Sequence, residues 1–159
     1  MADIVLGQAL REAVEEVLER MFFAETLGEA RDAHPSADEV AVELSFAGEP
    51  AGAMHLRLTS SAAGEIAADF LGMDAAEIAD TQVSEVIREL ANMICGSFLS
   101  RVESAATFHL SVPRMVSPGE ELPQDASNTR CCVQLANGRL TVNIAAEIPI
   151  CPRPVPSAY

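Results

Sequence analysis

Three polar residues within one predicted helix have the types and the spacing to do chemistry together. Glu85, Glu89 and Asn92 lie in the stretch SEVIRELANMICG, with Arg88 and Cys95 flanking them. At positions i, i+4 and i+7 they fall along one face of an α-helix, about a turn apart. The Asn92 amide can donate and accept hydrogen bonds at once. It could therefore hold a water molecule in line with a scissile bond, as a Gln or Asn does in phosphoryl hydrolysis.

Plainer interpretations compete with this one. A Glu and an Asn on an exposed helix face are usually only solvated, and the spacing alone favours that interpretation. The asparagine weighs slightly against it, because Asn in a helix interior costs several tenths of a kcal/mol relative to Ala. A metal site on Glu85 and Glu89 lacks a His or a further carboxylate on the same face. The two carboxylates also repel each other unless Arg88 or a lysine of a partner lies nearby.

The rest of the chain predicts the elements that position this helix. Apolar residues at three- and four-residue spacing predict an amphipathic helix over 4–27, with Gly28 as its stop. Alternating apolar residues predict strands at 40–46 and 54–58, joined into a hairpin across the turn sequence AGEPAG. The other predicted elements are a helix over 61–72, the long helix over 81–103, and strand-like segments at 106–113, 130–136 and 139–148.

These elements predict an α+β fold, with two long helices packed on one face of a largely antiparallel β-sheet. A weak pseudo-twofold order supports it. Helix 4–27 leads to one hairpin and helix 81–103 leads to another group of strands, although no stretch of sequence repeats closely. We expect a single domain over residues 1–150 and a Pro-rich tail over 151–159 that cannot continue a sheet.

Composition and charge narrow the class of function. The chain has 159 residues, 49% hydrophobic and 21% charged, which is a globular composition with enough length for a real core. Its net charge of −14 argues against DNA, RNA and anionic membrane surfaces as partners. The start MADIVLGQALREAVEEV lacks the regions of a signal peptide, and no apolar run approaches the ~20 residues of a membrane span. We therefore expect a cytoplasmic protein.

The cysteines and histidines predict neither a disulfide framework nor a metal site. In a cytoplasmic chain without paired CxxC spacing, the cysteines are expected to be reduced packing residues. They are Cys95, Cys131, Cys132 and Cys151. The histidines are too scattered to form a ligand set, being His34, His55 and His109.

Two stretches of the sequence resemble a known family. The stretch VSEVIRELANMICGSFLSRV is similar to the signature helix of the CheC/CheX chemotaxis phosphatases, whose motif is Glu-x-x-Asn within a longer ELxNMIxG pattern. The stretch VELSFAGEPAGAMHLRLTSSAAGEIAADFLGM resembles the family's strand–turn–strand and the helix after it. The likeness covers most of residues 1–148. It points to the CheX-like branch, because the CheC branch carries the motif in both long helices and helix 4–27 contains no Asn.

The resemblance implies an enzyme that hydrolyses the aspartyl phosphate of a phosphorylated CheY-type response regulator in chemotaxis or two-component signalling. Glu89 would pair with a lysine in the regulator's active site, and Asn92 would orient the attacking water. Glu85 and Arg88 would bind the partner. The chain would need no cofactor of its own, since the Mg²⁺ belongs to the regulator. One departure stands out, because the family has Asp or Ser where this chain has Glu85.

The sequence also leaves open an alternative function and predicts an oligomeric state. The alternative function is a non-catalytic module that binds response regulators or serves as a scaffold, like the related flagellar switch proteins. A homodimer that pairs sheet edges is also expected. The CheX branch is known for dimers, and the long strand sequence RLTVNIAAEI (139–148) has few charges to protect an edge.

Overall fold

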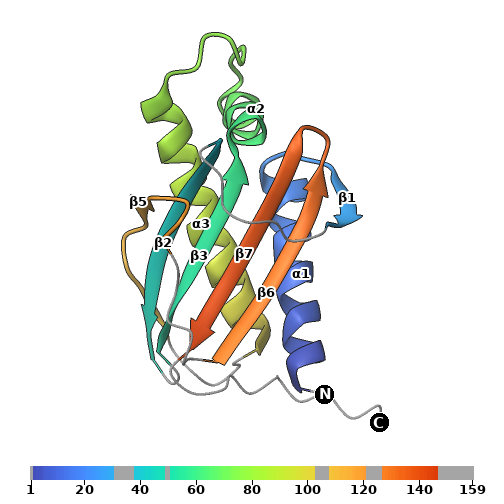
Figure 1. The fold of residues 1–159 in the computed structure, drawn as a ribbon, viewed down its shortest axis with the longest axis vertical. Coiled ribbons are helices and arrows are strands. Elements are labelled where there is room, and N and C mark those ends of the chain that lie inside the picture. The colour runs from blue at the N-terminus through green and yellow to red at the C-terminus, as the bar shows by residue number, and fades with distance from the viewer. Residues whose placement is uncertain (1, 31–37, 49–50, 103–107, 121–126, 147–159) are drawn as a thin grey trace.

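A computed structural model describes residues 2–30, 38–48, 51–102, 108–120 and 127–146. This part of the chain forms three helices and seven strands (Figure 1). In order they are α1 (Ala2–Met21), β1 (Thr26–Glu29), β2 (Glu39–Ala47), β3 (Gly52–Thr59), α2 (Ser60–Leu71), α3 (Asp80–Val102), β4 (His109–Leu110), β5 (Arg114–Val116), β6 (Ser127–Leu135) and β7 (Gly138–Ala146).

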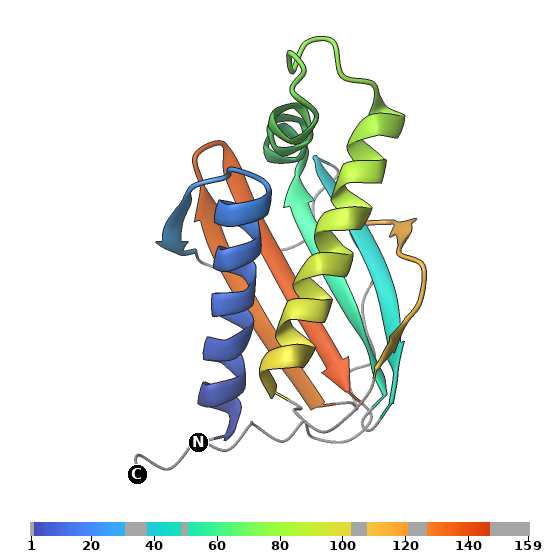
Figure 2. The same ribbon diagram turned by 180° about the vertical axis from the view of Figure 1, so that it is seen from behind.

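The strands form one antiparallel sheet in the order β1-β6-β7-β3-β2-β4, with β5 also paired to β2. Helices α1 and α3 lie side by side on one face of it, and α2 sits near one end (Figure 2). The β6–β7 hairpin, which turns at Ala136-Asn137, occupies the middle of the sheet between β1 and β3. The α+β fold with two long helices on one sheet face, predicted from the sequence, is confirmed.

Alternation along the strands explains how the core forms. On β2, Val42, Leu44 and Phe46 are buried, and on β3 so are Met54 and Leu56. These side chains point to the face that the helices cover, because every second residue of a strand lies on the same face. Each such side chain contributes about 1.5–3 kcal/mol when it is fully buried. The sheet and the two long helices therefore share one hydrophobic core.

The first helix is shorter than the predicted 4–27. It ends at Met21, and the residues after it form the edge strand β1, which contains Gly28. The chain turns at Phe23, whose backbone φ of 57° is left-handed, and the Ala24 N–H donates to the Leu18 carbonyl at 2.9 Å. Phe22 is fully buried and stacks on Phe70 of α2 at 4.7 Å between ring centroids. Tertiary packing of this ring therefore ends the helix before Gly28.

The segment predicted as a strand over 106–113 is mostly not a strand. Residues 103–107 lie outside the described part, and only His109–Leu110 pairs with β2 as β4. Pairing resumes at β5, where Glu43 lies opposite Arg114. Pro113 has no N–H to donate to a ladder, which accounts for the break before β5. The predicted tail at 151–159 also lies outside the described residues.

The expectation that 139–148 pairs at a sheet edge is wrong. Strand β7 pairs with β6 on one side and with β3 on the other, along nearly its whole length. The scarcity of charge in this sequence therefore goes with a central strand in which most residues from Leu140 to Ala146 are buried. Within the described residues, the outermost strands are β1 on one side and β4 and β5 on the other.

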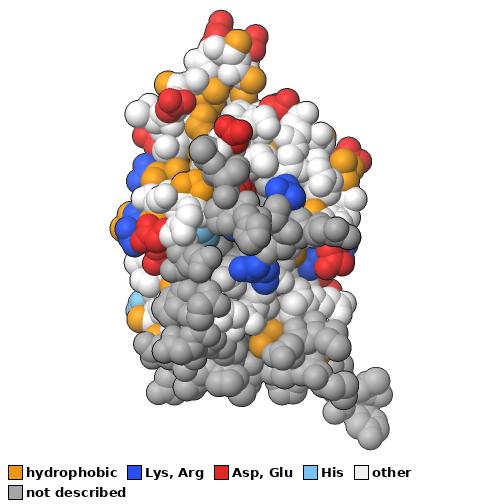
Figure 3. Space-filling view, viewed as in Figure 1, with side chains coloured by type: hydrophobic (Ala, Val, Ile, Leu, Met, Phe, Trp, Pro, Cys, Tyr) orange, Lys and Arg blue, Asp and Glu red, His pale blue; other side chains and the backbone are white. Residues whose placement is uncertain are grey.

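The sheet face away from the helices carries charged side chains of both signs (Figure 3). Glu39 and Arg57 form an ion pair there at 3.4 Å, with 4% and 9% of their side chains exposed. Burial, together with the nearby Arg57 charge, lowers the pKa of His55 on the same strand. Both effects favour the neutral imidazole. No helix among the described residues is long and apolar enough to cross a membrane.

Gly52 provides a test of the close contact between β3 and β7. A Cβ at this position would clash with the Ala145 carbonyl oxygen and lie 2.9 Å from the Ala146 Cα. We predict that Gly52→Ala lowers the free energy of unfolding by about 1–3 kcal/mol, measured by urea denaturation. Gly64→Ala is the matched control, since no atom within 4 Å would meet its Cβ in α2. It should raise stability by about 0.5–1 kcal/mol. A Gly52→Ala variant as stable as the wild type would contradict the prediction.

Candidate functional site

A groove of about 530 Å³ runs along α3. Glu85, Arg88, Glu89 and Asn92 line one wall, and residues 110–113 line the other. The structure thus brings together all four residues that the sequence analysis selected. They lie on one helix and face one concave surface, which a merely solvated helix face does not require.

Packing of α3 fixes the direction of these side chains. Leu90, Ala91 and Ile94 are fully buried against the core, whereas Glu89 is exposed and Asn92 is half-buried. The buried stripe and the polar line occupy different faces of the helix, as the helical period requires. The groove wall is therefore set by the hydrophobic core and needs no loop to position it.

Residues 110–113 form the opposite wall, which we call the lip. The Ser45 N–H donates to Ser111 Oγ at 2.8 Å, and the Ser111 N–H donates to the Ser45 carbonyl at 2.8 Å. Leu110 packs against the core, and an added Cβ on Gly96 of α3 would lie 4.0 Å from its Cδ1. The sequence analysis missed the lip as part of the site. The only local signal was Pro113, which interrupts a strand-like pattern.

The polar groups of the groove have few partners inside the molecule. Arg88 Nε donates to the Ser84 carbonyl at 3.4 Å on its own helix. Within the described ranges, the side chains of Glu85, Glu89 and Asn92 take part in no hydrogen bond or ion pair. Arg88 thus does not neutralise the two carboxylates, although the sequence left that alternative open. They remain available to a positive group from solution.

Cys95 does not flank the groove, contrary to the sequence analysis. It is fully buried, and burial raises the pKa of its thiol to about 12. Cys131 and Cys132 are likewise buried free thiols, and Cys151 lies outside the described residues. The described cysteines are therefore reduced packing residues. No group of three or more His, Cys, Asp or Glu side chains that could hold a metal ion occurs in the described part of the chain.

A second groove, of about 590 Å³, lies along α1 and repeats the first in its residue spacing. Its helix wall matches the wall of the α3 groove at a constant shift of 77 positions (8 to 85, 11 to 88, 12 to 89 and 15 to 92). The residues at these positions on α1 are Gln8, Arg11, Glu12 and Glu15, and Gly7 also lines the groove. The weak symmetry seen in the order of elements therefore extends to the two grooves.

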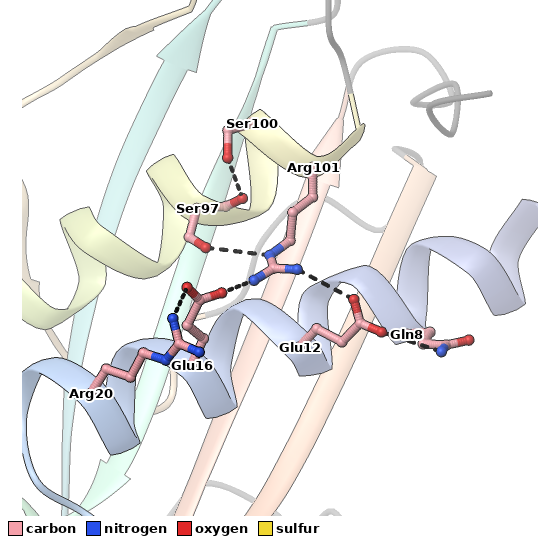
Figure 4. Close-up of polar contacts among 7 residues, drawn as sticks. All are labelled: Gln8, Glu12, Glu16, Arg20, Ser97, Ser100 and Arg101. Atoms are coloured by element: carbon pink, nitrogen blue, oxygen red, sulfur yellow. Dashed lines mark hydrogen bonds and ion pairs between the residues drawn. The ribbon is translucent and has the colours of Figure 1, made fainter. Parts of the chain in front are cut away.

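The two grooves differ in chemistry. Glu15 stands where the α3 groove has its amide, and it accepts from Arg11 Nε at 2.9 Å, which raises the pKa of that arginine. Glu12 accepts from Arg101 Nη1 at 3.3 Å, and Arg101 also pairs with Glu16 (Figure 4). The acidic groups of α1 thus form ion pairs within α1 and between α1 and α3. Only the α3 groove combines an amide with unpaired carboxylates.

Comparison with known proteins gives a consistent result. The family model described as chemotaxis phosphatase CheX matches residues 40–137. CheX of Borrelia burgdorferi, solved in complex with CheY, BeF3 and Mg²⁺, is 20% identical with a TM-score of 0.71, and the match covers 87% of this chain and 96% of that one. CheX of Desulfovibrio desulfuricans is 18% identical with a TM-score of 0.72, covering 89% and 99%.

A more distant likeness extends to a FliM domain. The FliM middle domain of Vibrio alginolyticus has a TM-score of 0.56 at 9% identity, with 94% of this chain and 95% of that one covered. Among curated proteins, none has a sequence that matches this chain. At these identities the solved structures show a shared fold.

Proposed function

The chain belongs to the chemotaxis phosphatase CheX family, and we propose that it hydrolyses the aspartyl phosphate of a phosphorylated CheY-type response regulator. One observation carries the proposal. Glu89 and Asn92 line a single groove without intramolecular partners in the described part of the chain. A carboxylate and an amide that are both unpaired, and one helical turn apart, suit a partner that brings a cation and a bond to be hydrolysed.

In this mechanism Asn92 contributes position rather than a proton. Its amide holds a water molecule in line with the phosphorus–oxygen bond to the regulator's aspartate. The water oxygen attacks phosphorus, the bond to the aspartate carboxylate breaks, and the products are inorganic phosphate and the free aspartate. Glu89 pairs with the regulator's active-site lysine. The Mg²⁺ that neutralises the phosphoryl group belongs to the regulator, so this chain supplies no cofactor.

The alternative is a module that binds the regulator without hydrolysis. We retain it because the chain shares its fold with the FliM middle domain. Loss of phosphate from an acetyl-phosphate-loaded regulator, with and without this protein, separates the two functions. The unpaired Asn92 favours hydrolysis. Hydrolysis requires a group that can hold the attacking water, whereas binding alone does not.

Removal of the Asn92 amide is the most direct test of catalysis. We predict that Asn92→Ala leaves the fold and regulator binding nearly intact, while the acceleration of dephosphorylation falls by about 10²-fold or more. Single-turnover phosphate release measures the effect. Glu15→Ala is the matched control, since Glu15 holds the corresponding position on α1. It should leave the rate unchanged, and wild-type turnover in Asn92→Ala would disprove the catalytic role.

The two carboxylates should differ in importance along the groove. Glu89→Ala should weaken both regulator binding and catalysis, with a larger effect at low salt, because an exposed charge contact is screened over about 10 Å at 0.1 M salt. Glu85→Ser, one turn further from Asn92, should change affinity by only about 0.2–1 kcal/mol and keep maximal turnover within a few-fold. Titration of regulator affinity and turnover at two salt concentrations measures both.

Glu12→Ala on α1 serves as the control for Glu89→Ala and should leave regulator affinity unchanged. The sequence contains no lysine. A carbodiimide that joins carboxylates to amines therefore finds no lysine in this chain, and mass spectrometry identifies a product in which Glu89 is coupled to a lysine of the regulator. Affinity of Glu89→Ala that equals the wild type and does not depend on salt would show that Glu89 is ordinary surface. Loss of turnover in Glu85→Ser at saturating regulator would place Glu85 in the catalytic site.

We also propose that the chain forms a homodimer, through a surface other than β7. The exposed apolar side chains around β1 support this, with Met21, Phe23 and Leu27 exposed by 47%, 71% and 54%. An apolar surface next to an outermost strand is a common site of association. Sedimentation velocity at micromolar concentration should show a dimer. A monomer under those conditions would reject the proposal.

A further inference from the structure

The lip presents an apolar side chain at the rim of the α3 groove. Val112 is 81% exposed, the highest value among the large apolar side chains of the described residues. A single exposed apolar residue is ordinary on a protein surface. Val112 differs because it lines the same groove as Glu89 and Asn92, on the opposite wall.

The backbone around Val112 is held firmly. On its N-terminal side Ser111 exchanges two hydrogen bonds of 2.8 Å with Ser45. On its C-terminal side Pro113 has a fixed φ, and β5 pairs again with β2. Arg114 adds an ion pair to Glu43 at 3.1 Å. The backbone that carries Val112 is therefore already ordered, so little backbone conformational entropy is lost when a partner covers this side chain.

The groove fits a protein surface better than a small molecule or a second copy of this chain. A small-ligand site buries most of its ligand, whereas the Val112 rim is open to solvent. A symmetric contact between two copies would bring the unpaired Glu85 and Glu89 of each copy together, and like charges at close range repel. A partner that presents a cation to Glu89 and an apolar area to Val112 matches both walls.

We propose that Val112 is the apolar contact of the regulator interface. It packs on an apolar surface of the receiver domain beside the phosphorylation pocket, and it sets affinity rather than the rate of the chemical step. This rests on the proposed function, in that the receiver domain is the occupant of the groove. Burial of an apolar side chain adds to the free energy of binding, while charged contacts fix register and the choice of partner.

Single-turnover dephosphorylation at varied concentrations of this protein tests the inference. Val112→Ala should raise the concentration needed for half-maximal rate about three- to tenfold, with the maximal rate within twofold of wild type. Val112→Asp should raise it further. Val5→Ala, an exposed valine on α1, is the control and should change neither quantity. An unchanged half-maximal concentration, or a fall confined to the maximal rate, would overturn the inference.

Direct binding of the phosphorylated regulator keeps this inference separate from the proposed hydrolysis. A wild-type protein that binds the regulator without accelerating phosphate loss would reject hydrolysis, and weaker binding by Val112→Ala would still support the contact. Equal binding by Val112→Ala and the wild type would overturn the contact even if hydrolysis is confirmed. A wild-type protein that does not bind the regulator at all would overturn both.

Discussion

Helix α3 can meet the sheet in only one rotational setting, and the candidate site depends on that setting. A rotation by one residue in one sense would turn Glu89 toward the sheet, and a rotation in the other sense would move Leu90 from the core to the solvent-exposed position of Glu89. Burial of an unpaired carboxylate costs several kcal/mol, and exposure of the leucine costs about 1.5–3 kcal/mol. The line of Glu85, Glu89 and Asn92 is therefore directed outward by the same forces that form the core. Chemistry and stability are determined by opposite faces of one helix.

The two grooves show how small a difference separates an available site from a structural one. Both helices carry an arginine and a glutamate at matching positions, yet on α1 the acidic groups bind Arg11 and Arg101. Those ion pairs are partly exposed, so each contributes little stability on its own. Because of these ion pairs, the carboxylates Glu12 and Glu15 of the α1 groove are already paired and are less available to a partner. On α3 the corresponding arginine folds back on its own helix and leaves the carboxylates unpaired among the described residues.

The sequence predicted the features that depend on periodicity within one element. The long strands, helix α3 and its polar line belong to this class, and so does the contrast between the two long helices at Asn92. Features that depend on distant contacts could not be predicted. The end of α1 is fixed when Phe22 meets Phe70, and the lip exists because Ser111 bonds to Ser45. The position of β7 within the sheet depends on which strands it pairs with, whereas its own apolar pattern fits an edge or a centre equally.

The central position of the β6–β7 hairpin has a consequence for how the chain assembles. Strand β1 near the N-terminus pairs with β6, and β3 pairs with β7. Neither β1 nor β3 can form these pairs until β6 and β7 have been synthesised. On a ribosome the helices and the β2–β3 hairpin emerge first. Their apolar faces are then exposed, because the sheet that they pack against in the folded protein is incomplete. The hairpin then enters between them and joins the two halves. Contacts so far apart in sequence slow folding, and until they form the apolar faces of the earlier elements remain exposed.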